Sequence, residues 1–514
     1  MEDNVLVSSK IHGRSKSTTA KRTHVEDRSI LVTNYNTLNC IICGQRISKR
    51  RRTQHNFQKI SRWQLNLQRT RPCLLNFQSL PEDIVLRVMS KLTLKEVARL
   101  SVVSTNWRQA WTFHPNLYFG IKTVLGNNAK RKGTSSDLNC RISSADKFIE
   151  RVDAILEKHC GTMVNKFAVK FGLSNEHANH VNGWVAFATA SKARVIILDF
   201  SPDWESHENN YDFPCHIFNK HNGSYLEALR LDSVTMNLPL DFCGFANLKL
   251  LALDNVRLQH LEQLISQCHV LEWLSIQSCN QLHNLHVSEP LCRLQYLSIQ
   301  GCHLQRMELH APNLTTFEYD GSLALVTLNE CSNIKTSTIN LFVEKTLKNI
   351  LTGIPSVLPH VETLYVEVHV KTQMSGFTQS PLKFTQLKCL TMEITFERGP
   401  FDRNSVFQLA YLLVAAPFLE DLYLDMYCSL NRCPLDLDDI VDQPHYHLKM
   451  VCIFGFCGNA GQVELAKYIL RNALILEQMI IDPKGRYRLQ GCFGREEAEK
   501  KLVPEDMDGV LTIL

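Results

Sequence analysis

The segment LPEDIVLRVMSKLTLKEVARLSVVSTNWRQAW, residues 80–111, decides the fold of the first part of the chain. Residues 79–82 and 93–96 each have the Ser/Thr-x-x-Glu pattern of a capping box, so we expect a helix to begin at each of them. Ser104 can cap a third helix, on which Trp107 and Trp111 lie four residues apart. The segment therefore predicts three short helices in close succession.

Apolar side chains recur at helical spacing through this segment. Ile84, Val88 and Leu92 form one stripe on the first helix, and a second stripe follows on the next helix. A unit this small cannot bury so much apolar surface against itself. We therefore expect part of this surface to be covered by a partner.

The segment resembles the F-box, the motif by which adaptor proteins dock onto the Skp-family subunit of cullin–RING ubiquitin ligases. The matching features are the opening Leu-Pro, the acidic pair after it, the apolar run and the closing Val-Ser…Trp-Arg…Trp; Thr105-Asn106 stands where the family often has a basic pair. The resemblance implies adaptor binding by Leu80, Pro81, Ile84, Val88, Leu92, Leu94, Val97, Leu100, Val103, Trp107 and Trp111. The alternative is a small helical hairpin that belongs to the core.

Length and composition indicate a folded protein of more than one structural unit. The chain has 514 residues, of which 44% are hydrophobic and 21% charged, as in ordinary soluble domains. The 18 cysteines are scattered through strand-like segments, so we expect buried free thiols in a reducing compartment. The sequence shows no signal peptide, and its longest apolar run is far too short to span a bilayer.

The first residues are strongly basic. Residues 1–72 contain 15 Lys and Arg against 4 Asp and Glu, while the remainder is mildly acidic and gives no reason to expect nucleic-acid binding. We expect residues 1–76 to be a disordered, basic N-terminal region. Its run Lys49-Arg50-Arg51-Arg52 is either a nuclear-import signal or a solvated charge cluster. Cys40 and Cys43 lack a second pair for a zinc site, so no metal is expected.

A repeated pattern organises the rest of the chain. The motif L-x-x-L-x-L, with conservative replacements, begins at residues 226, 248, 271, 294 and 314, and again at 361, 387, 419, 448 and 476. Within each of these two blocks the intervals of 20 to 32 residues are leucine-rich-repeat periods. Each repeat is expected to add one strand to a parallel sheet on the concave side of a solenoid. The fold class is therefore α/β: a small three-helix F-box followed by an irregular leucine-rich-repeat solenoid.

The elements around the repeats can also be predicted. We expect an F-box at 77–118, a linker and helix at 119–165 with a flexible connector over 120–146, and the solenoid at 166–514. The first elements of the solenoid are expected to be a strand over 167–171, a helix over 181–190 and a strand over 194–198. On the convex side, periodicity predicts helices over 261–270, 406–416 and 463–473, and extended segments between 271 and 330, where helices have no room.

The run LKMVCIFGFCGNAGQVELAKYILRNALILEQMIIDP, residues 448–483, resembles the FBD module that closes many plant F-box/leucine-rich-repeat proteins. The shared features are a strand ending in Gly-Phe-x-Gly, a helix after it and a final apolar strand. The resemblance assigns an FBD-like segment to 445–485. Together with the F-box, it implies a plant protein that recruits substrates to a Skp–cullin–F-box ubiquitin ligase, in the nucleus, the cytoplasm or both.

Enzyme chemistry is not indicated by the sequence. The glycines at 455, 458 and 461 precede a helix, but no Gly-Lys-Ser/Thr follows, and no nucleophile elbow or zinc-binding helix motif is present. We therefore expect a non-catalytic subunit without a cofactor, whose partners are the adaptor, through it a cullin–RING core, and an unidentified protein substrate, with no membrane partner. The alternative is a repeat-based scaffold outside any ligase.

The face that captures the substrate follows from side-chain alternation. In each repeat the residue between the last two apolar positions points away from the core. The candidates for substrate binding at this position are Arg230, Ser275, Ser298, Glu318, Tyr365 and Tyr423, and two further candidates, Trp273 and Tyr296, lie two residues earlier on the same face. Trp273 and Tyr296 belong to adjacent repeats, so we expect them to lie side by side. The alternative is that loops of the chain cover this pair.

Overall fold

The structure is a computed structural model of the chain, which divides into two units, Met1–Leu80 and Pro81–Leu514. The residues that it describes all belong to the second unit: 84, 87, 88, 90–103, 110–126, 138–160, 163–201, 209–219, 221, 223–239, 242–322, 326–341, 353–370, 382–396, 406, 409–427, 443–484 and 494–514. The predicted disordered head, the basic run at 49–52 and the cysteine pair at 40 and 43 lie outside these residues.

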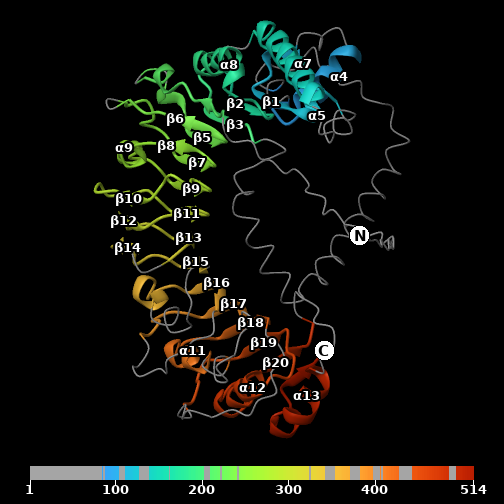
Figure 1. The fold of residues 1–514 in the computed structure, drawn as a ribbon, viewed down its shortest axis with the longest axis vertical. Coiled ribbons are helices and arrows are strands. Elements are labelled where there is room, and N and C mark those ends of the chain that lie inside the picture. Colours follow the sequence, from blue (N-terminus) through green and yellow to red (C-terminus); the bar gives the residue numbers. More distant parts are fainter. Residues whose placement is uncertain are drawn as a thin grey trace, which may run out of the picture. The chain divides into compact units, whose positions relative to one another are not determined.

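A parallel sheet of fifteen strands runs through the described residues, and the strands follow one another in chain order (Figure 1). It consists of β1 (Asn116–Gly120), β2 (Lys166–Lys170), β3 (Val195–Asp199), β5 (Ala228–Asp232), β7 (Leu250–Asp254), β9 (Trp273–Gln277), β11 (Tyr296–Gln300), β13 (Thr316–Asp320), β15 (Thr336–Leu341), β16 (Thr363–Val370), β17 (Cys389–Phe396), β18 (Asp421–Tyr427), β19 (Met450–Phe454), β20 (Gln478–Asp482) and β21 (Leu511–Ile513). This confirms the predicted leucine-rich-repeat sheet.

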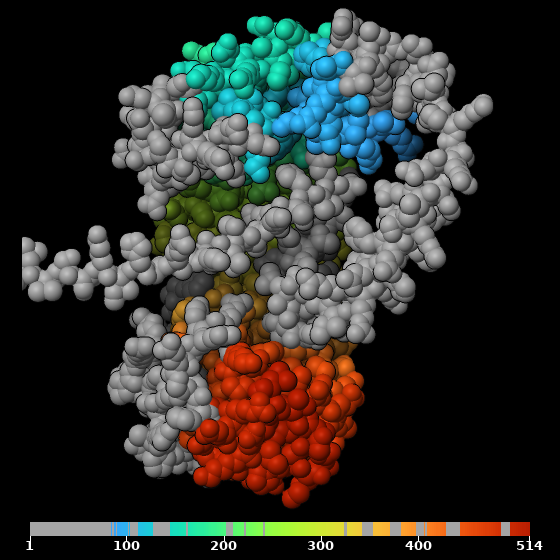
Figure 2. Space-filling view, turned by 90° about the vertical axis from the view of Figure 1, so that its right-hand side faces the viewer, coloured from blue at the N-terminus to red at the C-terminus, as the bar shows by residue number. Residues whose placement is uncertain are grey.

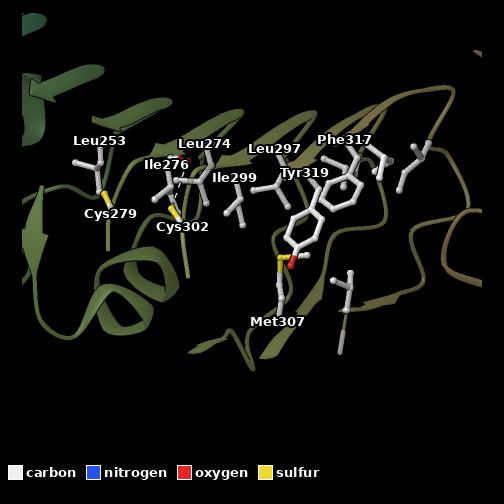
Figure 3. Close-up of a cluster of buried hydrophobic side chains, with 14 of the residues drawn as sticks. Leu253, Leu274, Ile276, Cys279, Leu297, Ile299, Cys302, Met307, Phe317 and Tyr319 are labelled. Atoms are coloured by element: carbon white, nitrogen blue, oxygen red, sulfur yellow. Dashed lines mark hydrogen bonds between the residues drawn. The ribbon is translucent and has the colours of Figure 1, made fainter. Parts of the chain in front are cut away.

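The repeated apolar residues hold the strands in register. Leu229, Leu251, Leu274, Leu297 and Phe317 are partners across five neighbouring strands, and each is at most 1% exposed. Figure 3 shows the central part of this row beneath the sheet, together with a second apolar row two residues further along each strand. A slip of one residue would move every one of these side chains to the opposite face, so burial fixes the register.

Helices and short strands cover the core side of the sheet. The helices are α7 (Leu138–Glu157), α8 (Ala178–Ala190), α9 (Leu261–Gln267), α11 (Ala410–Ala415) and α12 (Ala460–Asn472). Two three-stranded sheets are β4 (Tyr211–Asp212), β6 (Val234–Met236) and β8 (Arg257–Leu258), and β10 (Asn284–His286), β12 (Arg306–His310) and β14 (Val326–Asn329). The predicted helices and the extended segments between residues 271 and 330 are confirmed.

The C-terminal elements form a continuous block in Figure 2, which contains β19, β20, α12, α13 (Gly494–Lys501) and β21. Gln462 on α12 is fully buried and joins the helix to the loop after β19. Its Nε2 atom donates to the Gly455 carbonyl at 3.1 Å, and its Oε1 atom accepts from the Cys457 amide at 2.9 Å. This strand–turn–helix is the segment whose sequence resembles the FBD module.

The sheet begins earlier than the sequence indicated. Strand β1 pairs with β2 in parallel over five residues, so the sheet starts at Asn116 rather than at residue 166. The segment expected to be a flexible connector contains the short helix α5 (Ile121–Val124) and the first turns of α7. The repeat motif could not reveal β1, because the segment Asn116–Gly120 does not carry the leucine pattern.

Strand β15 fills the gap between the two predicted blocks of repeats. In this repeat Ser337 stands where the motif has its second leucine, and it is 1% exposed on the core side. Its Oγ atom donates to the Phe317 carbonyl at 2.7 Å, which satisfies the hydroxyl inside the core. The hydrogen bond explains how a polar residue occupies a leucine position, and why a search for leucines missed the strand.

Replacing Ser337 with alanine should lower the free energy of unfolding by about 1 kcal/mol, because a buried hydrogen bond is lost. The urea midpoint followed by circular dichroism measures the effect. Ser275→Ala, at a half-buried position on the opposite face of the sheet, is the control and should leave the midpoint unchanged. Equal shifts for both variants would contradict this role of the Ser337 hydroxyl.

Candidate functional site

Helix α4 (Leu94–Val103) begins with the predicted capping box. The Thr93 amide donates to the Glu96 carboxylate at 2.7 Å, and the Glu96 amide donates to Thr93 Oγ1 at 3.3 Å. The backbone hydrogen bond from Thr93 lowers the pKa of Glu96. The two reciprocal bonds satisfy the first free amides of the helix and fix where it starts.

The described part of the F-box region presents several apolar side chains at its surface. Ile84, Val88 and Leu100 are 37%, 40% and 38% exposed, whereas Leu92, Leu94 and Trp111 are half-buried. Val97 is fully buried, so its side chain is covered by the chain itself and supports α4 from inside. Leu80, Pro81, Trp107 and the side chain of Val103 lie outside the described part. The exposed residues are the ones available for contact with an adaptor.

Two side chains tie the F-box region to the first strand of the sheet. His114 is fully buried; its Nδ1 atom accepts from the Asn116 amide at 3.1 Å, so the proton lies on Nε2, which donates to the Leu92 carbonyl at 3.1 Å. The Asn116 side chain donates to the Ser90 carbonyl at 3.1 Å. Since Asn116 opens β1, these bonds connect the F-box region directly to the sheet.

We call the side of the fifteen-stranded sheet that points away from the core the concave face. The central residues of the strands form one row across it, as the alternation predicted. Among the predicted substrate-binding residues in this row, Arg230 is exposed, Ser275, Tyr365 and Tyr423 are half-buried, and Ser298 and Glu318 are buried. The structure therefore brings the predicted residues together on one surface, although not all are accessible.

The side chains of Trp273 and Tyr296 stack on each other in this face. They are register partners in β9 and β11, their ring centroids are 3.4 Å apart, and their planes differ by 12°. Both are half-buried, so neither ring is fully covered. The prediction that they lie side by side is confirmed. Such an aromatic pair offers a flat, rigid platform of the kind common at interface centres.

Sequence reasoning missed a row of acids on the same face, four residues further along the strands than the aromatic pair. We call it the acidic row: it occupies one register position on the concave face, two residues beyond the central row, and consists of Asp199, Asp232, Asp254, Asp320, Glu367, Glu393, Asp425 and Asp482. Burial, followed by the charges of Asp199 and Asp254, raises the pKa of Asp232 to about 6. The sequence signal was an acid directly after the final apolar residue of several repeats.

The opposite edge of the sheet carries charges of alternating sign. We call this the edge ladder. Each of its members is the residue directly before a strand: Arg194, Glu227, Lys249, Glu272, Lys335, Glu362, Lys388, Glu420, Lys449 and Glu477. Glu362 pairs with both Lys335 and Lys388 at 3.8 Å. Glu420 accepts a hydrogen bond from Lys449 at 2.8 Å, which lowers its pKa. Alternation places opposite charges next to each other, so it supports the register.

Six of the free cysteines that the structure describes are buried, at positions 215, 268, 279, 302, 452 and 457. Burial raises the pKa of the Cys268 thiol to about 12, so it is protonated and unreactive at neutral pH. Five of these cysteines fill the core as small apolar side chains, whereas Cys452 lies on the opposite face of the sheet, in β19. None of the helices in the described residues is both long and apolar enough to cross a membrane.

Comparison with known proteins identifies two families. The F-box domain matches residues 77–118, and the leucine-rich-repeat domain of the At1g61320/AtMIF1 type matches residues 155–507. The chain is 22% identical over 412 residues to the F-box/FBD/LRR-repeat protein At1g13570 of Arabidopsis thaliana, which covers 78% of this chain and 89% of that protein. It is 28% identical over 256 residues to the F-box/LRR-repeat protein At3g26922 of the same plant, covering 48% of this chain and 75% of that protein.

The chain belongs to the plant F-box/leucine-rich-repeat family, with a repeat domain of the At1g61320/AtMIF1 type. Members of this family are typically non-catalytic adaptors, and an F-box domain implies binding to a Skp-family adaptor. The match to the F-box confirms the resemblance drawn from the Leu-Pro start and the spaced tryptophans.

Replacing Asp232 with asparagine should stabilise the fold at pH 7.5. The pKa of Asp232 is about 6 in the folded chain against a usual 3.8, so above pH 6 folding carries the penalty of an ionised, crowded carboxylate. The penalty shrinks as the pH falls from about 6 towards 3.8, and it is gone below 3.8, where both states hold the proton. The variant should therefore melt at a higher temperature at pH 7.5 and lose this advantage near pH 4. A gain that grows as the pH falls would contradict the assignment.

Proposed function

We propose that this chain is the substrate-recruiting subunit of a Skp–cullin–F-box ubiquitin ligase. The observation that supports this most directly is the F-box match at residues 77–118, followed at once by a long solenoid with an aromatic and acidic face. In this proposal the F-box binds the Skp-family adaptor, which connects the chain to a cullin–RING core. The concave face holds a protein target, and ubiquitin transfer is carried out by the other subunits.

The connection between the two parts matters for this function. A target can be modified only if the solenoid presents it at a steady distance from the catalytic subunits, because effective concentration falls with loose tethering. The hydrogen bonds from His114 to Leu92 and from Asn116 to Ser90 join the described residues of the F-box region to the start of β1. In this proposal these contacts limit the movement of the solenoid, and of the target bound to it, relative to the F-box and its adaptor.

Adaptor docking is tested by replacing Leu80 and Pro81 with alanine in one variant. Anchors at an interface centre typically cost about 2 kcal/mol or more each when truncated, so co-purification of the adaptor and cullin should be lost. The control is Leu474→Ala with Ile475→Ala, which truncates two apolar side chains that are 59% and 44% exposed far along the sequence. Undiminished adaptor binding by the Leu80 and Pro81 variant would refute the proposal and favour a scaffold outside any ligase.

Target capture is tested at the aromatic pair. Trp273→Ala and Tyr296→Ala should each reduce the proteins recovered by proximity labelling under proteasome inhibition, because each removes half of the stacked platform. Adaptor binding should be unchanged, which is checked on the same preparations. A labelling profile identical to that of the unmodified chain would place target binding elsewhere on the solenoid.

A further inference from the structure

The acidic row is part of an unbroken series of polar acceptors. From Asp199 in β3 to Asp425 in β18, every strand of the sheet has a carboxylate or a side-chain amide at this position; Gln277, Gln300 and Asn340 supply the amides. Neighbouring members lie about 4.8 Å apart, the spacing of hydrogen-bonded strands. The series therefore runs across the concave face at right angles to the strands.

The concave face is one-sided in charge. The concave face carries Lys166 and Lys170 on β2 and Arg230 on β5, and Lys170 forms an ion pair with Asp199. From β7 to β21 the residues of the described strands that lie on the concave face include no Lys or Arg. They carry eight carboxylates: Asp254, Glu318, Asp320, Glu367, Glu393, Asp421, Asp425 and Asp482. Such a surface attracts cations and repels nucleic acid and other polyanions.

Two further observations indicate what kind of cation this face accommodates. The Oδ1 atom of Asn340, in the middle of the series, is buried and accepts no hydrogen bond from any residue that the structure describes. It lies between Asp320 and Glu367, and it has almost no exposed surface, so a donor from a bound group reaches it once the Asn340 side chain rotates. The carboxylates are spread out in a line, and nowhere in the described part do acidic, histidine or cysteine side chains gather in a group able to hold a metal ion.

We propose that the concave face binds an extended, lysine- and arginine-rich segment of the target protein, an inference that rests on the proposed function. The basic side chains lie along the acidic row between β7 and β18, and backbone groups of the segment bond to the amides of Gln277, Gln300 and Asn340. The stacked rings of Trp273 and Tyr296 lie four residues before this row on their strands. They contact an apolar or guanidinium group of the same segment.

The spacing of the row fits an extended chain. Asp254 and Asp320 are three strands apart, and Asp320 and Glu367 are two strands apart, which corresponds to roughly 14 Å and 10 Å. In an extended peptide, side chains on one side repeat about every 6.8 Å. A basic residue can therefore reach Asp254, a second one four positions later can reach Asp320, and a third one two or four positions after that can reach Glu367. Long, flexible lysine side chains absorb the remaining mismatch.

The test uses the full-length chain and a fluorescein-labelled peptide of twelve residues in which lysine and serine alternate. A peptide with glutamine in place of lysine is the matched probe. The concave variant is Asp254→Asn, Asp320→Asn and Glu367→Gln together. The edge variant is Glu227→Gln, Glu362→Gln and Glu420→Gln together, which removes the same charge from the edge ladder. Thermal unfolding confirms that both variants are folded.

The unmodified chain should bind the lysine peptide at least about tenfold more tightly than the glutamine peptide, with an affinity that falls as salt rises. The concave variant should bind the lysine peptide about tenfold more weakly and with a shallower salt dependence, whereas the edge variant should retain its affinity within about twofold. Equal losses in both variants, or no preference for lysine over glutamine, would overturn the inference.

Adaptor co-purification from the same preparations separates the two proposals. If the adaptor binds but the lysine peptide is not preferred, the basic-segment inference is overturned and the ligase function stands. If the adaptor does not bind, the proposed function is overturned. Peptide binding that depends on the acidic row would in that case assign the same surface to a protein outside a ligase.

Discussion

The structure depends on rows of apolar side chains that match across parallel strands. Leu229, Leu251, Leu274, Leu297 and Phe317 meet as register partners, and each is removed almost completely from water. At about 1.5–3 kcal/mol for each fully buried large apolar side chain, these rows outweigh any individual polar contact in the sheet. A repeat can vary in length and in its outer elements, provided that the residues at these positions are apolar or form a buried hydrogen bond, as Ser337 does with the Phe317 carbonyl.

The same constraint creates the opposite face. Because strand side chains alternate, fixing one set toward the core places the other set in rows on the concave face. Residues far apart in sequence, such as Asp254 and Glu367, thereby join one charged line, and Trp273 meets Tyr296. Burial, and after it the like charges of this line, raises the pKa of Asp232, which is a cost to folding at neutral pH. A surface that carries this cost is more readily understood as a binding face than as a structural one.

Side-chain hydrogen bonds join the described residues of the F-box region to the first strand of the solenoid. His114 is buried in one tautomer because the Asn116 amide occupies its Nδ1 atom, and its Nε2 atom holds the end of the preceding segment. Strand β1 thus belongs at once to the sheet and to the end of the F-box match at residue 118. This arrangement makes the end of the F-box match and the start of the sheet one continuous structure.

The sequence by itself determined the F-box, through two capping boxes and the spaced tryptophans, and the repeat sheet, through the recurrence of L-x-x-L-x-L. Both are local signals that short-range chemistry imposes on the chain. It also predicted that Trp273 and Tyr296 are neighbours, because alternation and repeat length suffice for that. It did not reveal β1 or β15, since β1 lacks the leucine pattern and Ser337 replaces a leucine with a hydrogen bond that only the folded core supplies. Only the tertiary structure decided that Val97 is covered, that the two rings stack, and that acids from many repeats align, because each depends on how distant strands are placed in register.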